Sequence, residues 1–368
     1  MSSENKTKEH IIPNAIGGRK KTTGFICEVC NNTFGETWDA ELVKQLNWFS
    51  LALGISRERG EAPRQIVQTV AGERFWLLAD GTFTPEKSSH SVTDVGTGVQ
   101  IQMTAQTLDE ARKRIKGVAR KFPKFDVQKA LNELEVKTSF LDSPLHMSLS
   151  LGGPDAGRSL VKTAFAFASD CGIDHAKCEK AAEYLLDRTL TEIPFGFAYI
   201  SDLIERRPAD FVFHCVSLHA DPKSGRIYSY IEYFGLFRLI VLLGEKYDGP
   251  FRTECYSINP IDGSPASIRV KEVITDELIE IIKGGGFDQE KHEAAAEYAL
   301  SIMHERGRSR TLLHFVKQGF EHAGKSLGIK EGESIPPEQA EKFTALMMEK
   351  VFPYLKNLVG TSRPKTEH

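Results

Sequence analysis

The chain has 368 residues, of which 40% are hydrophobic and 26% are charged. This composition is typical of a globular protein and excludes a wholly disordered chain, a collagen-like chain and a small disulfide-stapled toxin, while about 100–200 residues per domain predicts two domains. With 47 Lys and Arg against 50 Asp and Glu, the net charge of −3 does not indicate a nucleic-acid binder, so an anionic partner would need a local basic patch.

Neither a membrane span nor a secretory signal is expected. The longest apolar run, from Phe234 to Gly244, is interrupted by Arg238 and is far shorter than the roughly 20 residues that cross a bilayer. The first ten residues are polar and lack the apolar segment of a signal peptide. The six cysteines are therefore expected to be reduced thiols or metal ligands, and the protein to be cytoplasmic with no membrane partner.

The first 54 residues (1–54) are expected to form one compact module. An apolar run that ends at Pro13 predicts a short strand, and the pair Gly17-Gly18 predicts a tight turn after it. The chain would then return along a second strand and enter a helix whose apolar residues recur with helical spacing. The stripe that we expect this helix to bury comprises Trp38, Leu42, Leu46 and Phe49.

The rest of the chain is expected to be an α+β body at residues 55–274, followed by a helical C-terminal region at residues 275–368 that packs on it. Turn residues, alternating apolar residues and helix caps predict its elements. In chain order these are a hairpin turn at Asp80-Gly81, a strand over 99–105, a helix from Thr107 to Phe122, a strand over 146–151, and four or five strands between Phe211 and Val270. The fold class is therefore α+β.

Residue types suited to phosphodiester chemistry lie close together in the N-terminal module. His10, with an ordinary pKa of about 6.5, could take a proton from a water molecule that attacks phosphorus. Glu9 and Asn31 offer hard oxygen ligands, which suit Mg²⁺ or Mn²⁺. Residues at the end of the first strand can face those that open the helix if the strands and the helix fold back on one another. The connecting loop adds cations that we expect to contact phosphates, namely Arg19, Lys20 and Lys21.

The run EHIIPNAIGGRKKTTGFICEVCNNTFG, residues 9–35, resembles the motif of the HNH endonuclease family. It is especially similar to the subgroup with an acidic residue before the first His and a CxxCN sequence before the helix. The resemblance implies a ββα-metal nuclease module in which His10 is the general base and Glu9 and Asn31 hold the divalent ion. Asn32 and Asp39 are weaker candidates for the same site.

Two positions depart from the family pattern. Many relatives hold a structural Zn²⁺ with two CxxC pairs, whereas this chain has one pair, Cys27 and Cys30, and no cysteine in the ten residues up to His10. Either the zinc is absent and the thiols pack as small apolar groups, or distant ligands complete the site. The middle Asn of the motif is expected near residue 24, which is Gly24, and Asn14 or a backbone carbonyl is the candidate substitute.

Two further patterns suggest anion binding. The helix expected over 107–122 projects a row of cations that could run along a DNA backbone, although a solvated helix face is the alternative. These cations are Arg112, Lys113, Lys116, Arg120 and Lys121. The stretch Gly152–Ser159 matches a phosphate-binding loop, but Arg158 replaces the lysine and Pro154 removes a backbone donor, so a nucleotide ligand is not expected.

These observations predict an HNH-type endonuclease that hydrolyses DNA phosphodiester bonds with a divalent metal ion. Relatives of this kind commonly serve in bacterial restriction and anti-phage defence. The larger body would then select the target, form a homodimer or bind a companion defence protein. The alternative is a catalytically degenerate ββα module that binds nucleic acid or docks a partner.

Overall fold

The computed structural model describes residues 6–96, 99–132, 134, 139–187, 189 and 192–361. Contacts divide the chain into two compact units, each built from segments that lie far apart in the sequence. The first unit combines residues 1–63 with 149–306, and the second combines 64–148 with 307–368. These boundaries differ from the consecutive segments expected above, because residues of the expected body are shared between both units.

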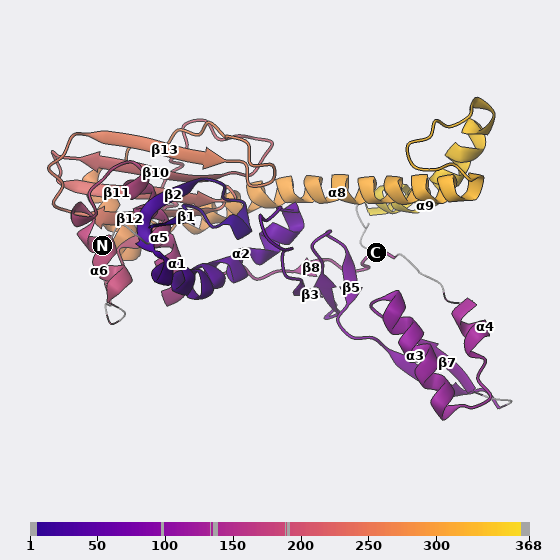
Figure 1. The fold of residues 1–368 in the computed structure, drawn as a ribbon. Helices are drawn as coiled ribbons and strands as arrows, with labels where there is room; N and C mark the ends of the chain where they lie inside the picture. The colour runs from indigo at the N-terminus through magenta and orange to yellow at the C-terminus, as the bar shows by residue number, and fades with distance from the viewer. Residues whose placement is uncertain are drawn as a thin grey trace, which may run out of the picture. The chain divides into compact units, whose positions relative to one another are not determined.

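The first unit begins with two strands and a helix (Figure 1). The strands pair antiparallel, with Glu9 opposite Thr22 and His10 opposite Lys21. The helix follows the second strand directly and continues through a π-helical turn, which confirms the expected ββα order at the start of an α+β chain. The elements are β1 (Lys6–His10), β2 (Lys21–Cys27), α1 (Glu28–Phe34), the π-helical turn Gly35–Asp39 and α2 (Ala40–Leu53).

The turn between the two strands requires both of its glycines. Gly17 has a φ angle of +105°, and a Cβ atom built there would lie 2.6 Å from the carbonyl oxygen of Pro260. A Cβ atom on Gly18 would lie 1.9 Å from the carbonyl oxygen of Ile12. Because neither position has room for a side chain, the glycine pair lets the backbone turn against itself and against the loop that holds Pro260.

The apolar stripe expected in the N-terminal helix is buried. Trp38, Leu42, Leu46 and Phe49 are each at most 1% exposed, as predicted from their spacing. They belong to one hydrophobic core that includes the buried residues of helix α5 (Pro154–Asp170). The N-terminal module therefore folds as part of the first unit and shares its core.

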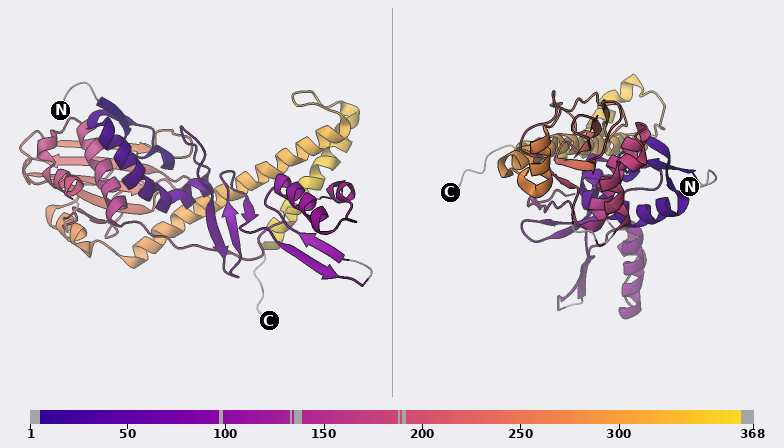
Figure 2. Two further views of the ribbon diagram at one scale, coloured as in Figure 1. Left: turned by 60° about the horizontal axis from the view of Figure 1, so that its bottom comes forward. Right: turned by 90° about the vertical axis from the view of Figure 1, so that its left-hand side faces the viewer.

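A five-stranded antiparallel sheet lies at the centre of the first unit, in the order β13-β10-β11-β12-β9. Every residue of β12 and all but one residue of β10 and of β11 are buried, so both faces of the sheet are covered. Helix α5 and the N-terminal module cover one face (Figure 2), and residues from the segments 198–213 and 266–282 cover the other. The elements are α6 (Glu179–Leu186), β9 (Phe195–Phe197), β10 (His214–Asp221), β11 (Arg226–Tyr233), β12 (Phe237–Gly244), β13 (Arg252–Ile258) and α7 (Thr275–Glu280).

The second unit contains a four-stranded sheet in the order β5-β4-β3-β8 and the hairpin β6-β7. The turn at Asp80-Gly81 and the strand within 99–105 are confirmed, and Thr107 caps α3 by accepting a hydrogen bond from the Glu110 N–H. The strand expected over 146–151 is shorter, because β3 pairs with Leu145–His146 alone. The elements are β3 (Gln65–Thr69), β4 (Arg74–Leu77), β5 (Phe83–Pro85), β6 (His90–Asp94), β7 (Val99–Met103), α3 (Leu108–Lys121), α4 (Val127–Asn132) and β8 (Leu145–His146).

The C-terminal part of the chain is helical, as expected. Helix α8 (Gln289–Leu327) contributes its residues up to 306 to the first unit and the remainder to the second. Within the second unit, Phe315 of α8 stacks on Tyr354 of α9 (Ala340–Thr361), with ring centroids 5.4 Å apart. No helix in the described part of the chain combines the length and apolar character needed to cross a membrane.

Candidate active site in the N-terminal module

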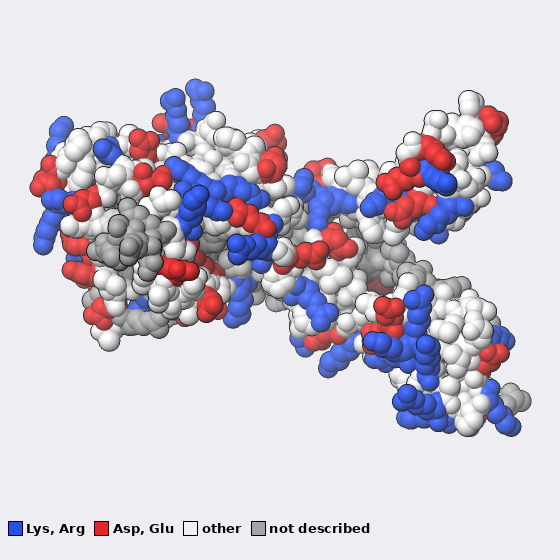
Figure 3. Space-filling model, in the orientation of Figure 1, with Lys and Arg blue, Asp and Glu red and all other residues white. Residues whose placement is uncertain are grey.

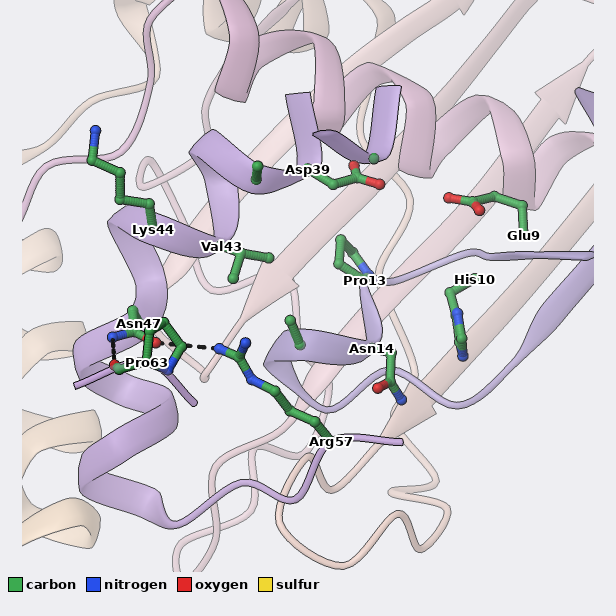
Figure 4. Close-up of a pocket in the computed structure, with 13 residues that line it drawn as sticks. Glu9, His10, Pro13, Asn14, Asp39, Val43, Lys44, Asn47, Arg57 and Pro63 are labelled. Atoms are coloured by element: carbon green, nitrogen blue, oxygen red, sulfur yellow. Dashed lines mark hydrogen bonds between the residues drawn. The ribbon is translucent and has the colours of Figure 1, made fainter. Parts of the chain in front are cut away.

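A cavity of about 420 Å³ opens beside the end of β1 in the first unit (Figure 4). The carboxylates of Glu9 and Asp39 lie along one side of it, and the guanidinium of Arg57 lies across from them. The cavity thus joins the end of the first strand, the π-helical turn and the loop that follows α2. Its lining comprises Glu9, His10, Pro13, Asn14, Ala15, Gly35, Asp39, Ala40, Val43, Lys44, Asn47, Arg57 and Pro63.

His10 is held by a carboxylate from the loop after α2. Its Nε2 lies 3.2 Å from Oε1 of Glu58, whose other oxygen accepts a hydrogen bond from Lys21 Nζ at 2.8 Å. Hydrogen bonds from Lys21 and His10 lower the pKa of Glu58 to about 2, so this group is an ionised acceptor at neutral pH. Nε2 of His10 must therefore carry the hydrogen, which leaves Nδ1 as the unprotonated nitrogen.

The charge state of His10 suits a general base. Burial lowers the pKa of His10 below its usual value, and this effect outweighs the hydrogen bond to Glu58, which raises it. The imidazole is consequently neutral at pH 7, with a lone pair on Nδ1. A neutral imidazole in a cavity of this size can accept a proton from a water molecule.

Asn14 links the turn between the strands to the carboxylate that holds His10. Its Nδ2 donates to the carbonyl oxygen of Gly18 at 3.1 Å, and its Oδ1 accepts from the Glu58 N–H at 2.8 Å. Gly24, at the position where an Asn was expected, has a φ angle of +78°. Asn14 thus holds both the loop and the partner of His10, and its role as the substitute for that Asn stays a prediction.

The acidic residues of the cavity are bonded to a lysine from the helix that packs beneath them. Nζ of Lys162, in α5, donates to Oε1 of Glu9 and to Oδ2 of Asp39. Oγ of Ser159, one turn earlier, donates to Oδ1 of Asp39 at 2.6 Å. Lys162 is 1% exposed. Burial would lower its pKa, but the charges of Asp39 and Glu9 outweigh burial and raise the pKa, so the ammonium stays charged.

The remaining motif residues lie at the start of α1. Nδ2 of Asn31 donates to Oγ1 of Thr7 at 3.3 Å, and Asn31 does not line the cavity. Asn32 is exposed. Sγ of Cys27 accepts a hydrogen bond from the Cys30 N–H at 3.5 Å and so caps the helix. Hydrogen bonds from Cys30 lower the pKa of Cys27, whereas the side-chain contact with Cys27 raises the pKa of Cys30.

The arrangement in the cavity does not fit a divalent metal ion. Glu9 and Asp39 are carboxylates of the right chemistry, but both bond to the Lys162 ammonium, and Asn31 bonds to Thr7 instead. In the part of the chain that the structure describes, no group of three or more His, Cys, Asp or Glu side chains is placed to hold a metal ion. The ligand roles of Glu9 and Asn31 stay predictions, and both alternatives for Cys27 and Cys30, packed thiols or a zinc site, stay open.

The three cations of the connecting loop have partners within the first unit. Nη2 of Arg19 donates to the carbonyl oxygen of Ser56, Lys20 pairs with Asp170 at 2.7 Å, and Lys21 bonds to Glu58. Arg57 differs from them. Its Nη2 donates to Oδ1 of Asn47 at 3.2 Å, but its buried Nε has no partner among the described residues. Arg57 therefore lines the cavity with a buried donor that no described residue uses.

The cations predicted on α3 belong to the second unit. All five of them (Arg112, Lys113, Lys116, Arg120 and Lys121) are exposed. Figure 3 shows Lys and Arg side chains gathered over this helix. Asp109, at its start, pairs with Arg112 at 3.3 Å. An exposed cationic face of this kind suits a DNA backbone, and its phosphate contacts stay a prediction.

Three residues that line the cavity or bond to its lining residues were missed by sequence reasoning. Lys162 carried a signal, because a single lysine inside the apolar run LVKTAFAFA indicates a buried partner of opposite charge. Arg57 and Glu58 carried none, since they lie in an ordinary polar loop. The phosphate-loop pattern is explained by the start of α5, where Pro154 is the first helical residue and Ser159 bonds to Asp39.

Comparison with known proteins agrees with the motif. Residues 1–47 match the family model described as HNH endonuclease. The match includes the acidic-His pair at the end of β1 and the CxxCN sequence at the start of α1. Searches of curated proteins and of solved structures found no match to the chain. The HNH motif is thus confirmed for the N-terminal module, and the match does not extend to the other residues.

Proposed function

We propose that the N-terminal module is a nuclease that hydrolyses phosphodiester bonds in DNA, with His10 as its general base. The observation that carries this proposal is the setting of His10, which lines the cavity as a neutral imidazole held at Nε2 by Glu58. The HNH family match over residues 1–47 supports the same reaction class.

In the proposed step, Nδ1 of His10 takes a proton from a water molecule whose oxygen forms a bond to phosphorus. The bond from phosphorus to the 3′-oxygen breaks, and this oxygen takes a proton from solvent. Glu58 stabilises the imidazolium that forms, because its carboxylate accepts the hydrogen on Nε2. General-base catalysis of this kind contributes about 10²–10⁴-fold to a rate.

Arg57 is proposed to bind the phosphate across the cavity. Burial lowers the pKa of Arg57, and the free Nε shows that its donors are not all used within the described part of the protein. A phosphate in the cavity would pair with the guanidinium and compensate the buried charge. Asn47 holds the guanidinium in place through its contact with Nη2.

The requirement for a divalent metal ion stays a prediction. The resemblance implies Mg²⁺ or Mn²⁺ held by Glu9 and Asn31, whereas Glu9 bonds to Lys162 in the structure. We infer DNA as the substrate, and a role in bacterial restriction or anti-phage defence, from the resemblance of residues 1–47 to the HNH family. Target selection, a homodimer or a companion defence protein are assigned to the rest of the chain. One ββα site cuts one strand, so double-strand cleavage would need two copies or two successive nicks.

A degenerate module that binds nucleic acid or a partner without cutting is the second candidate. Two observations favour it: the Lys162 ammonium neutralises the acidic pair, and Gly24 replaces the expected Asn. Such a module would bind DNA in a gel-shift assay and leave it intact.

The test is cleavage of supercoiled plasmid by the full chain in Mg²⁺, Mn²⁺ or EDTA. We compare the wild type with His10→Ala, with Arg57→Gln, and with Arg59→Gln as a control, because Arg59 is a neighbouring exposed arginine outside the cavity lining. We expect nicking that His10→Ala abolishes, that Arg57→Gln weakens and that Arg59→Gln retains. The EDTA arm tests the metal requirement.

Cleavage that survives His10→Ala would refute His10 as the base. A folded wild type that binds DNA and cuts it under none of these conditions would support the degenerate module instead.

A further inference from the structure

Lys162 is an unusual residue for its place in the fold. It lies in the middle of α5, where every residue from Ala156 to Ala168 is buried. Its side chain is 1% exposed and its ammonium reaches the two acidic groups of the cavity, Glu9 and Asp39. Those partners precede it in the sequence by 153 and 123 residues. A buried lysine is retained at such a position when it neutralises buried carboxylates.

The two carboxylates would otherwise form a pair of hard oxygen ligands. Their side chains are 12% and 14% exposed for Glu9 and Asp39, so they reach the cavity while their other sides are buried. Both oxygens of Asp39 are used, one by Lys162 and one by Ser159. A divalent ion entering here would meet an ammonium already bound to the same oxygens, and the two cations would repel each other in a poorly solvated place.

We propose that Lys162 is a built-in counter-ion that closes the Glu9–Asp39 pair to divalent metal ions, so that metal binds there only when the ammonium leaves. The lysine comes from α5, outside the segment that matches the HNH family. The larger part of the first unit therefore determines whether an ammonium or a metal ion occupies the carboxylate pair of the module. This inference concerns the site of the proposed nuclease and rests on that function for its effect on cleavage.

The test measures Mn²⁺ binding from the loss of the free-ion EPR signal. Lys162→Met removes the ammonium and keeps a side chain of similar length, and Lys162→Gln is a second variant that retains a hydrogen-bond donor. Lys177→Met is the matched control, because Lys177 pairs with the exposed Asp248 at 2.7 Å and is outside the cavity. The reversal variant Lys162→Met/Glu9→Gln removes one ligand of the site that Lys162→Met is expected to open.

We expect wild type, Glu9→Gln and Lys177→Met to bind Mn²⁺ equally. Lys162→Met should gain one site per chain, tighter by about tenfold or more than any wild-type site, and the reversal variant should lose it. Thermal unfolding of Lys162→Met should shift to higher temperature in Mn²⁺ than in EDTA, because a metal that binds the native state stabilises it. If the variant unfolds in EDTA, Mn²⁺ should restore its fold.

Three results would overturn the proposal. One is wild-type Mn²⁺ binding that Glu9→Gln abolishes, since metal and lysine would then share the pair. Another is that Lys162→Met and Lys162→Gln fold but gain no Mn²⁺ site. The third is that neither variant folds even in Mn²⁺. Because these signals report binding, adding His10→Ala should leave the gained site intact, so this inference and the proposed nuclease activity can fail separately.

Discussion

His214 connects the central sheet to the N-terminal module, and its charge state should set the acid stability of the first unit. The residue lies in β10 and is fully buried. Its Nε2 lies 2.7 Å from the carbonyl oxygen of Ile16, and its Nδ1 accepts a hydrogen bond from the Phe234 N–H at 3.0 Å. Nδ1 is therefore unprotonated and Nε2 carries the hydrogen, so the imidazole is neutral. Protonation of Nδ1 would break the bond to Phe234 and place an unpaired charge in the core.

The size of the effect follows from the pKa of this group. Burial lowers the pKa of His214 from 6.5 to about 4. Between these values the unfolded chain binds a proton that the native state refuses, so the contribution of His214 to stability is complete above pH 6.5 and is lost as the pH falls towards 4. This lowering of the pKa corresponds to about 3 kcal/mol of stability, of which about 2.5 kcal/mol is lost between pH 7.5 and 4.5.

Urea unfolding followed by tryptophan fluorescence can measure this loss. Trp38 and Trp48 lie in the first unit and Trp76 in the second, so a Trp76→Phe background reports the first unit alone. His214→Gln removes the titrating group while its amide can still donate towards Ile16. We expect this variant to be less stable at pH 7.5, by about 1–3 kcal/mol for the unpaired Phe234 N–H, and to lose about 2.5 kcal/mol less than the parent by pH 4.5.

His304→Gln is the matched control, because His304 is an exposed histidine of the same unit. It should follow the parent at every pH. Burial also lowers the pKa values of His10 and His219. Because both residues are present in the parent and in His214→Gln, their contributions cancel when these two proteins are compared. Equal acid sensitivity of parent and His214→Gln would refute the assignment of a neutral, buried His214 as the source of the effect.

Three other outcomes are expected. Gly18→Ala should destabilise the first unit by about 1–3 kcal/mol in the same urea assay, because its Cβ would lie 1.9 Å from the Ile12 carbonyl oxygen, and unchanged stability would contradict the close approach. Lys113→Ala/Lys116→Ala on α3 should weaken DNA binding and reduce the slope of log K against log salt concentration by about 2. The control Lys87→Ala should change neither, because Lys87 is an exposed lysine outside that helix. Equal slopes for the double variant and the wild type would exclude α3 as a phosphate contact. Cys27→Ala/Cys30→Ala should match the wild type in zinc content and in melting temperature, both with and without EDTA. If the wild type holds zinc that this double variant lacks, the thiol pair is a structural zinc site.

The ββα module could be recognised from the sequence because its signals are local. The glycine pair is required mainly because the backbone at Gly18 lies against that of Ile12, a few residues earlier; Pro260 adds one contact from a distant loop. The burial of the stripe from Trp38 to Phe49 was predicted from helical spacing alone. The Thr107 cap and the Asp80-Gly81 turn succeeded for the same reason. The strand over 146–151 was predicted too long, because strand length depends on the partner strand, and β3 pairs with two of its residues.

The division into units and the state of the candidate site were beyond sequence reasoning. Each unit joins segments that are distant in the chain, so dividing the sequence into consecutive stretches cannot delimit it. The motif supplied Glu9 and His10, but their partners arrive from elsewhere: Glu58 lies 48 residues beyond His10, and Lys162 lies 153 residues beyond Glu9. Short-range order thus establishes which chemical groups the module carries. Whether a carboxylate there can bind a metal depends on contacts of a few ångströms with distant residues, because hydrogen bonding and charge pairing act over that range and arise when the segments pack together.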